Sequence, residues 1–330
     1  MPKKDDDAIP AALQPKQSDL TFDLGRTLAA VVAVRASIPE DAFTASILGT
    51  ERSGSGVVIR DNGLVLTIGY LVTEAETIWL TSIDGRATPG HVLAYDQETG
   101  FGLIQALGRL DLPALEFGRS AGVQRGDPVI FAAAGGRRHA LAAEVVARQE
   151  FAGYWEYLIE DAIFTAPAHP LWGGAAVVSA DGKLLGIGSL HVQHADGNQR
   201  GGSGALDVNM AVPIDALGPI LDDLTIYGRP NRPPRPWLGA YFAEADGGGI
   251  VVAGLAKGGP AHRGGVHVGD AILAVSNERV SDLAGLYRLV WASGAAGIEI
   301  PFVVSRDGEQ RAVRVRSGDR ATFLKTPRLH

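Results

Sequence analysis

The candidate metal ligands in this chain are mainly histidines, because it contains no cysteine. His191 and His194 stand three positions apart, and His169 is the nearest histidine before them. Two residues that stand three positions apart have their side chains on one face of a helix but on opposite faces of a strand. Residues 184–190 (LLGIGSL) predict a strand that leads into this pair. We therefore expect no metal site and no cofactor, with a metal-binding protein built on the three histidines as an alternative.

Serine hydroxyls are the next candidates, as nucleophiles. A serine attacks when an imidazole takes its proton and a carboxylate orients that imidazole. The serines that could serve as a displaced nucleophile are Ser55, Ser82, Ser179 and Ser189. None of them has a histidine and a carboxylate in known reach, so a serine endopeptidase with a displaced nucleophile stays an alternative.

Aromatic side chains crowd one short stretch, interleaved with Glu150 and Glu156. They are Phe151, Tyr154, Trp155 and Tyr157. Aromatic residues are enriched at protein interfaces. This stretch therefore predicts a contact with a partner or a second subunit, and packing within the chain is the alternative.

Short β-rich runs separated by Gly, Asp and Asn turns fill residues 25–212, a pattern typical of all-β barrels or sandwiches. Asp-Asn-Gly at 61–63 and Asp-Gly at 181–182 are strong hairpin signals, because these residues tolerate positive φ. A helix with Pro219 in its first turn is expected to end at Gly228. Residues 229–236 (RPNRPPRP) then predict a stiff, extended linker.

The turn at residues 166–188 resembles the nucleophile turn of trypsin-type proteases of the HtrA/Deg family. That turn reads Asn-Pro-Gly-Asn-Ser-Gly-Gly-Pro, and residues 169–176 (HPLWGGAA) fall on its eight positions. Gly173 stands in place of the serine. Leu171 and Trp172 replace the Gly-Asn pair whose amides help form the oxyanion hole, so the resemblance implies that they fill the old cleft or line a new apolar pocket.

The other two turns of the resembling family's catalytic triad also match, again without the catalytic side chain. Residues 54–59 (GSGVVI) and 66–72 (LTIGYLV) fit the histidine turn, with Tyr70 in place of the histidine. Residues 96–104 (DQETGFGLI) fit the aspartate turn, with Gly100 in place of the aspartate. A phenol is a poor base near neutral pH, and glycine neither attacks nor orients. The resemblance therefore implies a pseudoprotease, an HtrA-like protein without proteolytic activity.

The rest of the chain, residues 237–317, resembles an HtrA-type PDZ domain. Its markers are residues 237–240 (WLGA), residues 265–273 (GVHVGDAIL), and a helix expected to start at an N-cap Ser281. An apolar stripe at helical spacing follows, formed by Leu283, Leu286, Tyr287 and Val290. The resemblance implies a site where main-chain amides bind a peptide's terminal carboxylate and the peptide adds as a strand. The residues expected at this site are Trp237, Leu238, Gly239, Ala240, Tyr241, Leu286 and Val290.

The predicted fold is mostly β, a trypsin-like pair of six-stranded barrels followed by one α+β PDZ domain. We place a flexible tail at 1–24, the barrels at 25–228, the linker at 229–236, the PDZ domain at 237–317 and a C-terminal tail at 318–330.

Composition narrows the classes of partner. The net charge of −7 over 330 residues, without a basic block, argues against nucleic acid and anionic membranes. No apolar run of signal-peptide length lies in residues 1–20 and none is long enough to span a membrane, so we expect a cytoplasmic protein, although the resembling family commonly acts outside the cytoplasm. The expected partner is a protein or C-terminal peptide. The match of residues 23–34 to the family's N-terminal region also implies a homo-oligomer, such as a trimer.

Overall fold

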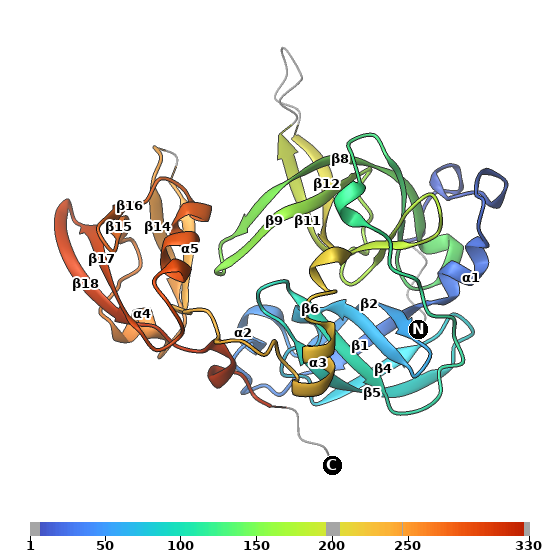
Figure 1. The fold of residues 1–330 in the computed structure, drawn as a ribbon, viewed down its shortest axis with the longest axis horizontal. Coiled ribbons are helices and arrows are strands. Elements are labelled where there is room, and N and C mark those ends of the chain that lie inside the picture. Colours follow the sequence, from blue (N-terminus) through green and yellow to red (C-terminus); the bar gives the residue numbers. More distant parts are fainter. Residues whose placement is uncertain (1–6, 196–204, 246, 327–330) are drawn as a thin grey trace. The chain divides into compact units, whose positions relative to one another are not determined.

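The computed structural model describes residues 7–195, 205–245 and 247–326. The chain forms two compact units (Figure 1). The first contains residues up to Gln149 and Asp161–Pro230, and the second contains Glu150–Glu160 and Asn231–Lys325. The second unit therefore includes a short segment that lies far from its main part in the sequence.

The first unit begins with a closed barrel in the strand order β1-β2-β3-β6-β5-β4. Its strands are β1 (Val31–Ser37), β2 (Glu51–Arg60), β3 (Leu64–Ile68), β4 (Thr77–Thr81), β5 (Ala87–Tyr95) and β6 (Phe101–Ala106). The predicted turn between β2 and β3 forms because Gly63 adopts a φ of 80° and the Asn62 side chain accepts a hydrogen bond from the Leu64 amide. A short helix, α2 (Ala45–Leu48), lies between β1 and β2.

A second closed barrel follows, in the order β10-β11-β12-β9-β8-β7. Its strands are β7 (Pro128–Ala132), β8 (Ala140–Gly153), β9 (Tyr157–Ala166), β10 (Ala176–Val178), β11 (Leu184–Ala195) and β12 (Ala205–Pro213). The two barrels confirm the prediction of a mostly β chain with two six-stranded barrels. Helix α3 (Leu221–Tyr227) follows β12 and ends at Gly228, whose left-handed φ of 72° confirms the expected stop.

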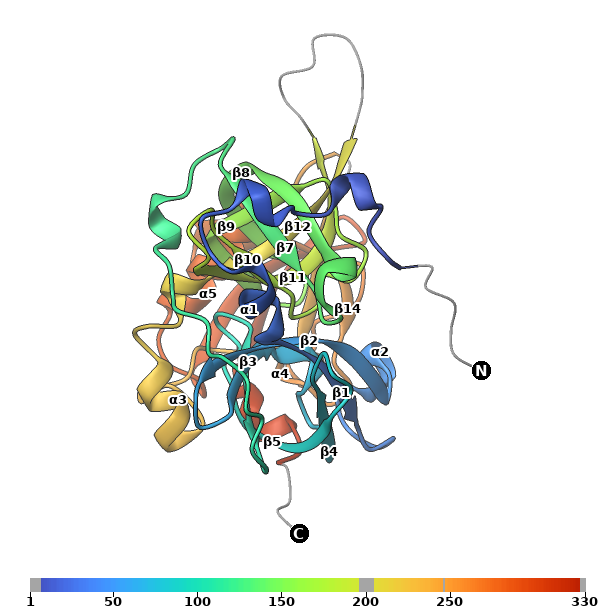
Figure 2. The same ribbon diagram turned by 90° about the vertical axis from the view of Figure 1, so that its right-hand side faces the viewer.

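The N-terminal segment packs against the second barrel, as Figure 2 shows for the blue part of the chain. Ile9 is buried in the core of that barrel, and its amide donates to the carbonyl of Arg138 at 2.8 Å. Further along, Asp23 caps helix α1 (Leu24–Ala29) by accepting from the Arg26 amide. The flexible tail predicted for residues 1–24 is therefore wrong for this described part, because one apolar side chain and its backbone bond hold it down.

The second unit is built on a sheet in the order β13-β14-β15-β17-β18, with β16 paired to β15. The strands are β13 (Ala240–Glu244), β14 (Ile250–Leu255), β15 (Ala271–Val275), β16 (Glu278–Arg279), β17 (Glu299–Arg306) and β18 (Glu309–Arg316). Helices α4 (Pro260–Arg263) and α5 (Leu283–Ala292) complete the unit. Asp282 caps α5 by accepting from the Gly285 amide, so the helix begins one residue later than an N-cap at Ser281 predicts.

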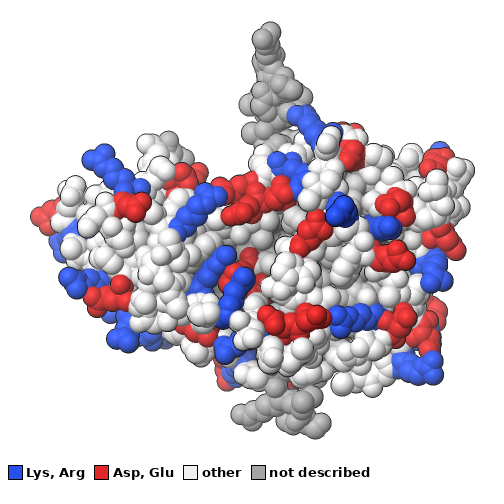
Figure 3. All heavy atoms as spheres, in the orientation of Figure 1, with Lys and Arg blue, Asp and Glu red and all other residues white. Residues whose placement is uncertain are grey.

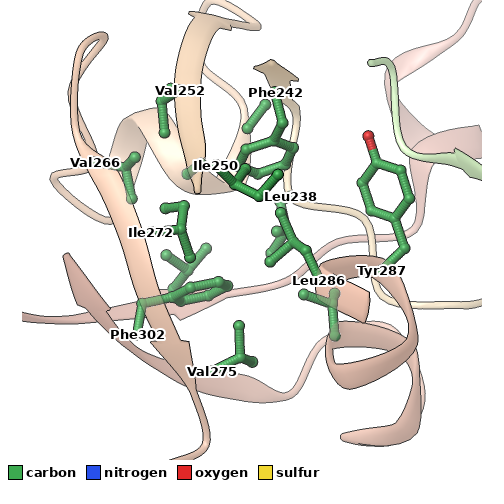
Figure 4. Close-up of a cluster of buried hydrophobic side chains, with 14 of the residues drawn as sticks. Leu238, Phe242, Ile250, Val252, Val266, Ile272, Val275, Leu286, Tyr287 and Phe302 are labelled. Atoms are coloured by element: carbon green, nitrogen blue, oxygen red, sulfur yellow. The ribbon is translucent and has the colours of Figure 1, made fainter. Parts of the chain in front are cut away.

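Apolar side chains of the sheet and of α5 form one buried core in the second unit (Figure 4). All four residues of the predicted helical stripe belong to it, which confirms the stripe. Residues 318–325 also pack on this unit: the Trp237 and Gly318 backbones pair, and the Phe323 ring lies 4.7 Å from the Trp237 ring. The first part of the predicted C-terminal tail at 318–330 therefore contacts Trp237 through Gly318 and Phe323.

Charged side chains of both signs are interspersed on the face seen in Figure 3. No helix in the described part of the chain is long and apolar enough to cross a membrane.

Candidate functional site

The turn at residues 169–176 is held in place by a buried histidine. The His169 amide donates to the Asn209 side chain at 2.6 Å, and the Leu171 amide donates to His169 Nδ1 at 2.9 Å. The Nε2 atom lies 3.1 Å from the His139 carbonyl. Burial lowers the pKa of His169 to about 4, so the ring is neutral near pH 7. Both ring nitrogens thus serve the turn, and neither offers a lone pair to a metal ion.

This histidine should make stability depend on pH. The pKa of His169 in the folded protein lies below the ordinary value of 6.5. Its contribution to the free energy of unfolding is therefore complete above pH 6.5 and is lost as the pH falls toward 4. We expect the stability difference between wild type and His169→Gln to shrink by about 1–2 kcal/mol from pH 7 to pH 5. Urea unfolding at both pH values measures this stability difference. His262→Gln, at an exposed histidine, is the matched control. A difference that stays constant would contradict the assignment.

Tyr70 and Gly173, at the predicted base and nucleophile positions, lie together. The Tyr70 hydroxyl donates to the Ser189 carbonyl at 2.9 Å, and a Cβ placed on Gly173 would lie 2.8 Å from the same hydroxyl oxygen. The Trp172 side chain also hydrogen bonds to this hydroxyl, and burial raises the pKa of Tyr70. A neutral phenol therefore occupies the space where the side chain of residue 173 would begin.

Gly100, at the predicted aspartate position, lies beside the Tyr70 turn. Its carbonyl accepts from the Gly69 amide at 2.7 Å. Its φ is 83°, a conformation that residues with a Cβ rarely adopt. The nearby Asp96 carboxylate is engaged by the amide and hydroxyl of Thr99 in the same turn. The structure thus places Gly100 beside the turn that carries Tyr70, and the Tyr70 hydroxyl beside Gly173.

A buried hydrogen-bond network of Arg52, Thr44 and Glu74, which the sequence analysis did not detect, supports the Tyr70 turn. Arg52 donates from Nη1 to the carbonyls of Tyr70 and Thr73, at 2.8 and 3.0 Å. The Thr44 hydroxyl accepts from Arg52 Nη2 and donates to the Glu74 carboxylate. Burial lowers the pKa of Arg52, and the charge of Glu74 opposes that change. These residues are far apart in sequence and form no motif, so the pattern alone gave no signal.

Leu171 and Trp172, assigned to the old cleft, are partly buried and pack against the second-barrel core. The Trp172 ring lies 5.4 Å from the His191 ring. Trp172 thus contacts both Tyr70 and His191.

The four candidate serines are engaged in local structure. Ser55 Oγ accepts from the Ala134 amide, and Ser189 is buried. Ser82 and Ser179 donate to aspartates in their own turns. Among the described residues, none of these serines hydrogen bonds to a histidine ring.

The two candidate metal ligands whose side chains are described, His169 and His191, do not form part of a metal-binding group. His191 lies on β11, 3.7 Å from the Asp207 carboxylate, while His169 is used in the turn. The side chain of His194 lies outside the described residues. In the described ranges no group of three metal-binding side chains is present.

The loop expected to bind a peptide carboxylate does hold a carboxylate, and it belongs to Glu156. The Leu238 amide donates to Glu156 Oε2 at 2.9 Å, and the amides of Gly239 and Ala240 donate to Oε1 at 2.7 and 3.2 Å. Gly239 adopts a φ of 70°, which lets consecutive amides point the same way. We call these three amides the carboxylate cradle.

Other predicted peptide-site residues surround the carboxylate cradle. Tyr241 follows it on β13 and is partly exposed, and its ring lies 6.1 Å from that of Tyr154. Trp237 precedes it and is buried. Leu286 and Val290 on α5 are fully buried in the core beneath. The predicted residues therefore meet in one place, and the two helical ones act as its apolar floor.

The aromatic stretch packs within the chain. The rings of Trp155 and Tyr157 stack at 5.5 Å, and Tyr154 contacts Trp155 edge to face at 4.9 Å. Phe151 lies 6.3 Å from Trp155. This stretch belongs to the second unit, so the intramolecular alternative describes it, with Tyr154 still 54% exposed.

Glu156 is fully buried, and this burial raises its pKa to about 7. Hydrogen bonds from the carboxylate cradle and the positive charge of Arg320 oppose the rise. Sequence reasoning named Glu156 only as a spacer between aromatics. Its acidic side chain beside aromatic residues was the available signal, but its target lies 82 to 84 residues away.

Two domain families match the chain. Residues 54–187 match the trypsin-like peptidase domain, and residues 236–316 match the PDZ domain. The chain carries a trypsin-like peptidase domain followed by a PDZ domain, as in the HtrA/DegP family. The carboxylate cradle thus lies in the part of the chain that matches the PDZ domain, and the Tyr70 turn lies in the part that matches the trypsin-like peptidase domain.

Several curated proteins are similar to both domains. A probable periplasmic serine endoprotease, DegP-like, from Pseudomonas fluorescens is 26% identical over 277 residues, which cover 80% of this chain and 56% of the relative. Protease Do-like 1, chloroplastic, from Arabidopsis thaliana is 26% identical over 318 residues, covering 88% and 69%. The chain thus spans little more than half the length of the first of these relatives.

Solved structures of similar fold include the HtrA-type protease AlgW with a decapeptide, at a TM-score of 0.55 and 24% identity, covering 92% of this chain and 98% of that one. The serine endoprotease from Yersinia pestis has a TM-score of 0.52 and 22% identity, covering 91% and 99%. These likenesses show the fold, a trypsin-like domain joined to a PDZ domain.

Proposed function

We propose that this protein is a non-proteolytic member of the HtrA-like fold that acts by binding a protein or peptide through its PDZ domain, as a scaffold, adaptor or chaperone-like subunit. The observation that carries the proposal is the Tyr70 hydroxyl, which lies 2.8 Å from the position of a Cβ on Gly173. A phenol whose pKa burial raises takes no proton near neutral pH. Gly173 and Gly100 supply neither a nucleophile nor a carboxylate.

The carboxylate cradle supports the binding half of the proposal. Its donors are main-chain amides, so they do not depend on the identity of the loop's side chains. They are aimed at a carboxylate, the group that a C-terminal peptide would bring. Peptide recognition at this loop needs none of the residues that differ from the protease triad.

Purified protein should show no serine-hydrolase activity. We expect no covalent labelling by a fluorophosphonate probe and no cleavage of unfolded casein, because a complete triad contributes roughly a millionfold in turnover. Gel fluorescence and peptide mass spectrometry measure both, with trypsin as the positive control.

The rival function is proteolysis by a displaced serine, favoured by the names of the relatives, which are serine endoproteases. Labelling of any serine that disappears in its alanine variant would establish that rival and contradict the proposal.

A further inference from the structure

The segment from Gly153 to Leu158 occupies the PDZ domain in the manner of a bound peptide. The Phe242 amide on β13 donates to the Tyr154 carbonyl at 2.9 Å, which is a backbone bond of strand addition. Two residues later, Glu156 places its carboxylate in the carboxylate cradle. A peptide that ends at this position would bring its terminal carboxylate to the same amides.

The segment can imitate a chain end because the backbone turns at Glu156. Its φ of 60° is in the left-handed region, which directs the chain away from the loop and on into β9. The side-chain carboxylate then takes the position that the main chain has left. Leu158 is 8% exposed and belongs to the same buried cluster as Leu286, so an apolar residue accompanies the carboxylate.

Tyr287 on α5 fixes this arrangement from the other side. Its hydroxyl donates to the Gly153 carbonyl at 2.7 Å and accepts from the Glu156 amide at 3.1 Å. Figure 4 shows the Tyr287 ring at the edge of the labelled apolar cluster. Strand addition, carboxylate capture and this bridge together fill the peptide site from within the second unit.

We propose that the segment 153–158 is a built-in competitor that closes the PDZ groove, and that C-terminal peptides bind by displacing Glu156 from the carboxylate cradle. This inference rests on the proposed function and names its regulation. The ligand class is a peptide with a free terminal carboxylate, an apolar last residue and an extended backbone two residues before it.

Two features favour the replacement of the Glu156 carboxylate by the terminal carboxylate of a peptide. Arg320 has Nε and Nη1 buried without a hydrogen-bond partner among the described residues, and its charge acts on both Glu156 and Tyr241. These two nitrogens are donors without a partner, and their positive charge reaches Glu156. The burial that raises the pKa of Glu156 also makes its docked carboxylate less stable than a solvated one.

Peptide affinity of full-length variants tests the proposal. The probe is the fluorescent peptide acetyl-Phe-Ala-Gly-Tyr-Trp-Leu with a free carboxylate, which repeats residues 151–155 and ends in register with Glu156. Its C-terminal amide is the control ligand. Glu156→Ala should bind the free acid about tenfold tighter than wild type or more, because apparent affinity falls with the fraction of closed groove. Glu160→Ala removes an exposed carboxylate on β9, just after the segment, and should bind as wild type does.

Hydrogen exchange of wild type with saturating free-acid peptide gives a second measurement. Amides of residues 153–158 should exchange faster when the peptide is bound, because their docked contacts are lost. If Glu156→Ala does not fold, Glu156→Gln carries the same expectation and keeps the side-chain volume.

Three results would overturn the proposal. Equal affinity of wild type and Glu156→Ala for the peptide would contradict the role of segment 153–158 as a competitor, while peptide binding itself would stand. Peptide binding without faster exchange at 153–158 would place the peptide elsewhere. If neither wild type nor any variant binds either peptide, that result would also contradict the peptide-binding part of the proposed function.

Discussion

Restoring the triad with Tyr70→His, Gly100→Asp and Gly173→Ser should leave casein cleavage at the wild-type background. The new aspartate would sit at a φ of 83°, a strained position for a residue with a Cβ. Leu171 and Trp172 would still fill the turn whose amides must form the oxyanion hole, and losing one such donor costs about 100- to 1,000-fold in turnover. Initial rates of fluorescent casein cleavage measure the outcome.

The informative control adds Leu171→Gly and Trp172→Asn, which restores the turn of the resembling proteases. We expect any recovered activity to appear only in this five-residue variant, because it alone has room for the oxyanion. Robust cleavage by the triple variant would show that the cleft had remained open around Leu171 and Trp172.

Glu74→Ala should destabilise the trypsin-like domain by about 3–5 kcal/mol, a cost typical of leaving a buried charge without its opposing charge. Glu74 is 5% exposed and accepts from the amides of Phe43 and Thr44. Its loss would leave Arg52 buried without its opposing charge, and Arg52 holds the Tyr70 carbonyl. Guanidinium unfolding followed by circular dichroism measures the change.

Glu76→Ala is the matched control, because Glu76 lies two residues away and is exposed. Its effect should stay within about 0.5 kcal/mol. Equal effects of the two substitutions would mean that the Arg52–Thr44–Glu74 network does not support the Tyr70 turn.

The β-rich barrels and the order of the two domains could be predicted from the sequence, and the absence of triad side chains at three turns stays a prediction from it. These features are local: Asp-Asn-Gly and Asp-Gly turns, an apolar stripe on α5, and short motifs around Tyr70, Gly100 and Gly173. Each depends on residues within a few positions of one another. That is why they could be predicted without knowing which strands become neighbours.

The tertiary structure was needed to show which side chains lie at the Tyr70 turn and at the carboxylate cradle. Tyr70 meets Gly173 across 103 positions and Glu156 meets Gly239 across 83 positions. Neither separation leaves a periodic pattern, because such contacts depend on how barrels close and how a hairpin tip is placed. The pKa of Glu156 is likewise a consequence of burial, which no single residue type encodes. The sequence could therefore name the carboxylate cradle, while the fold supplied the carboxylate that occupies it.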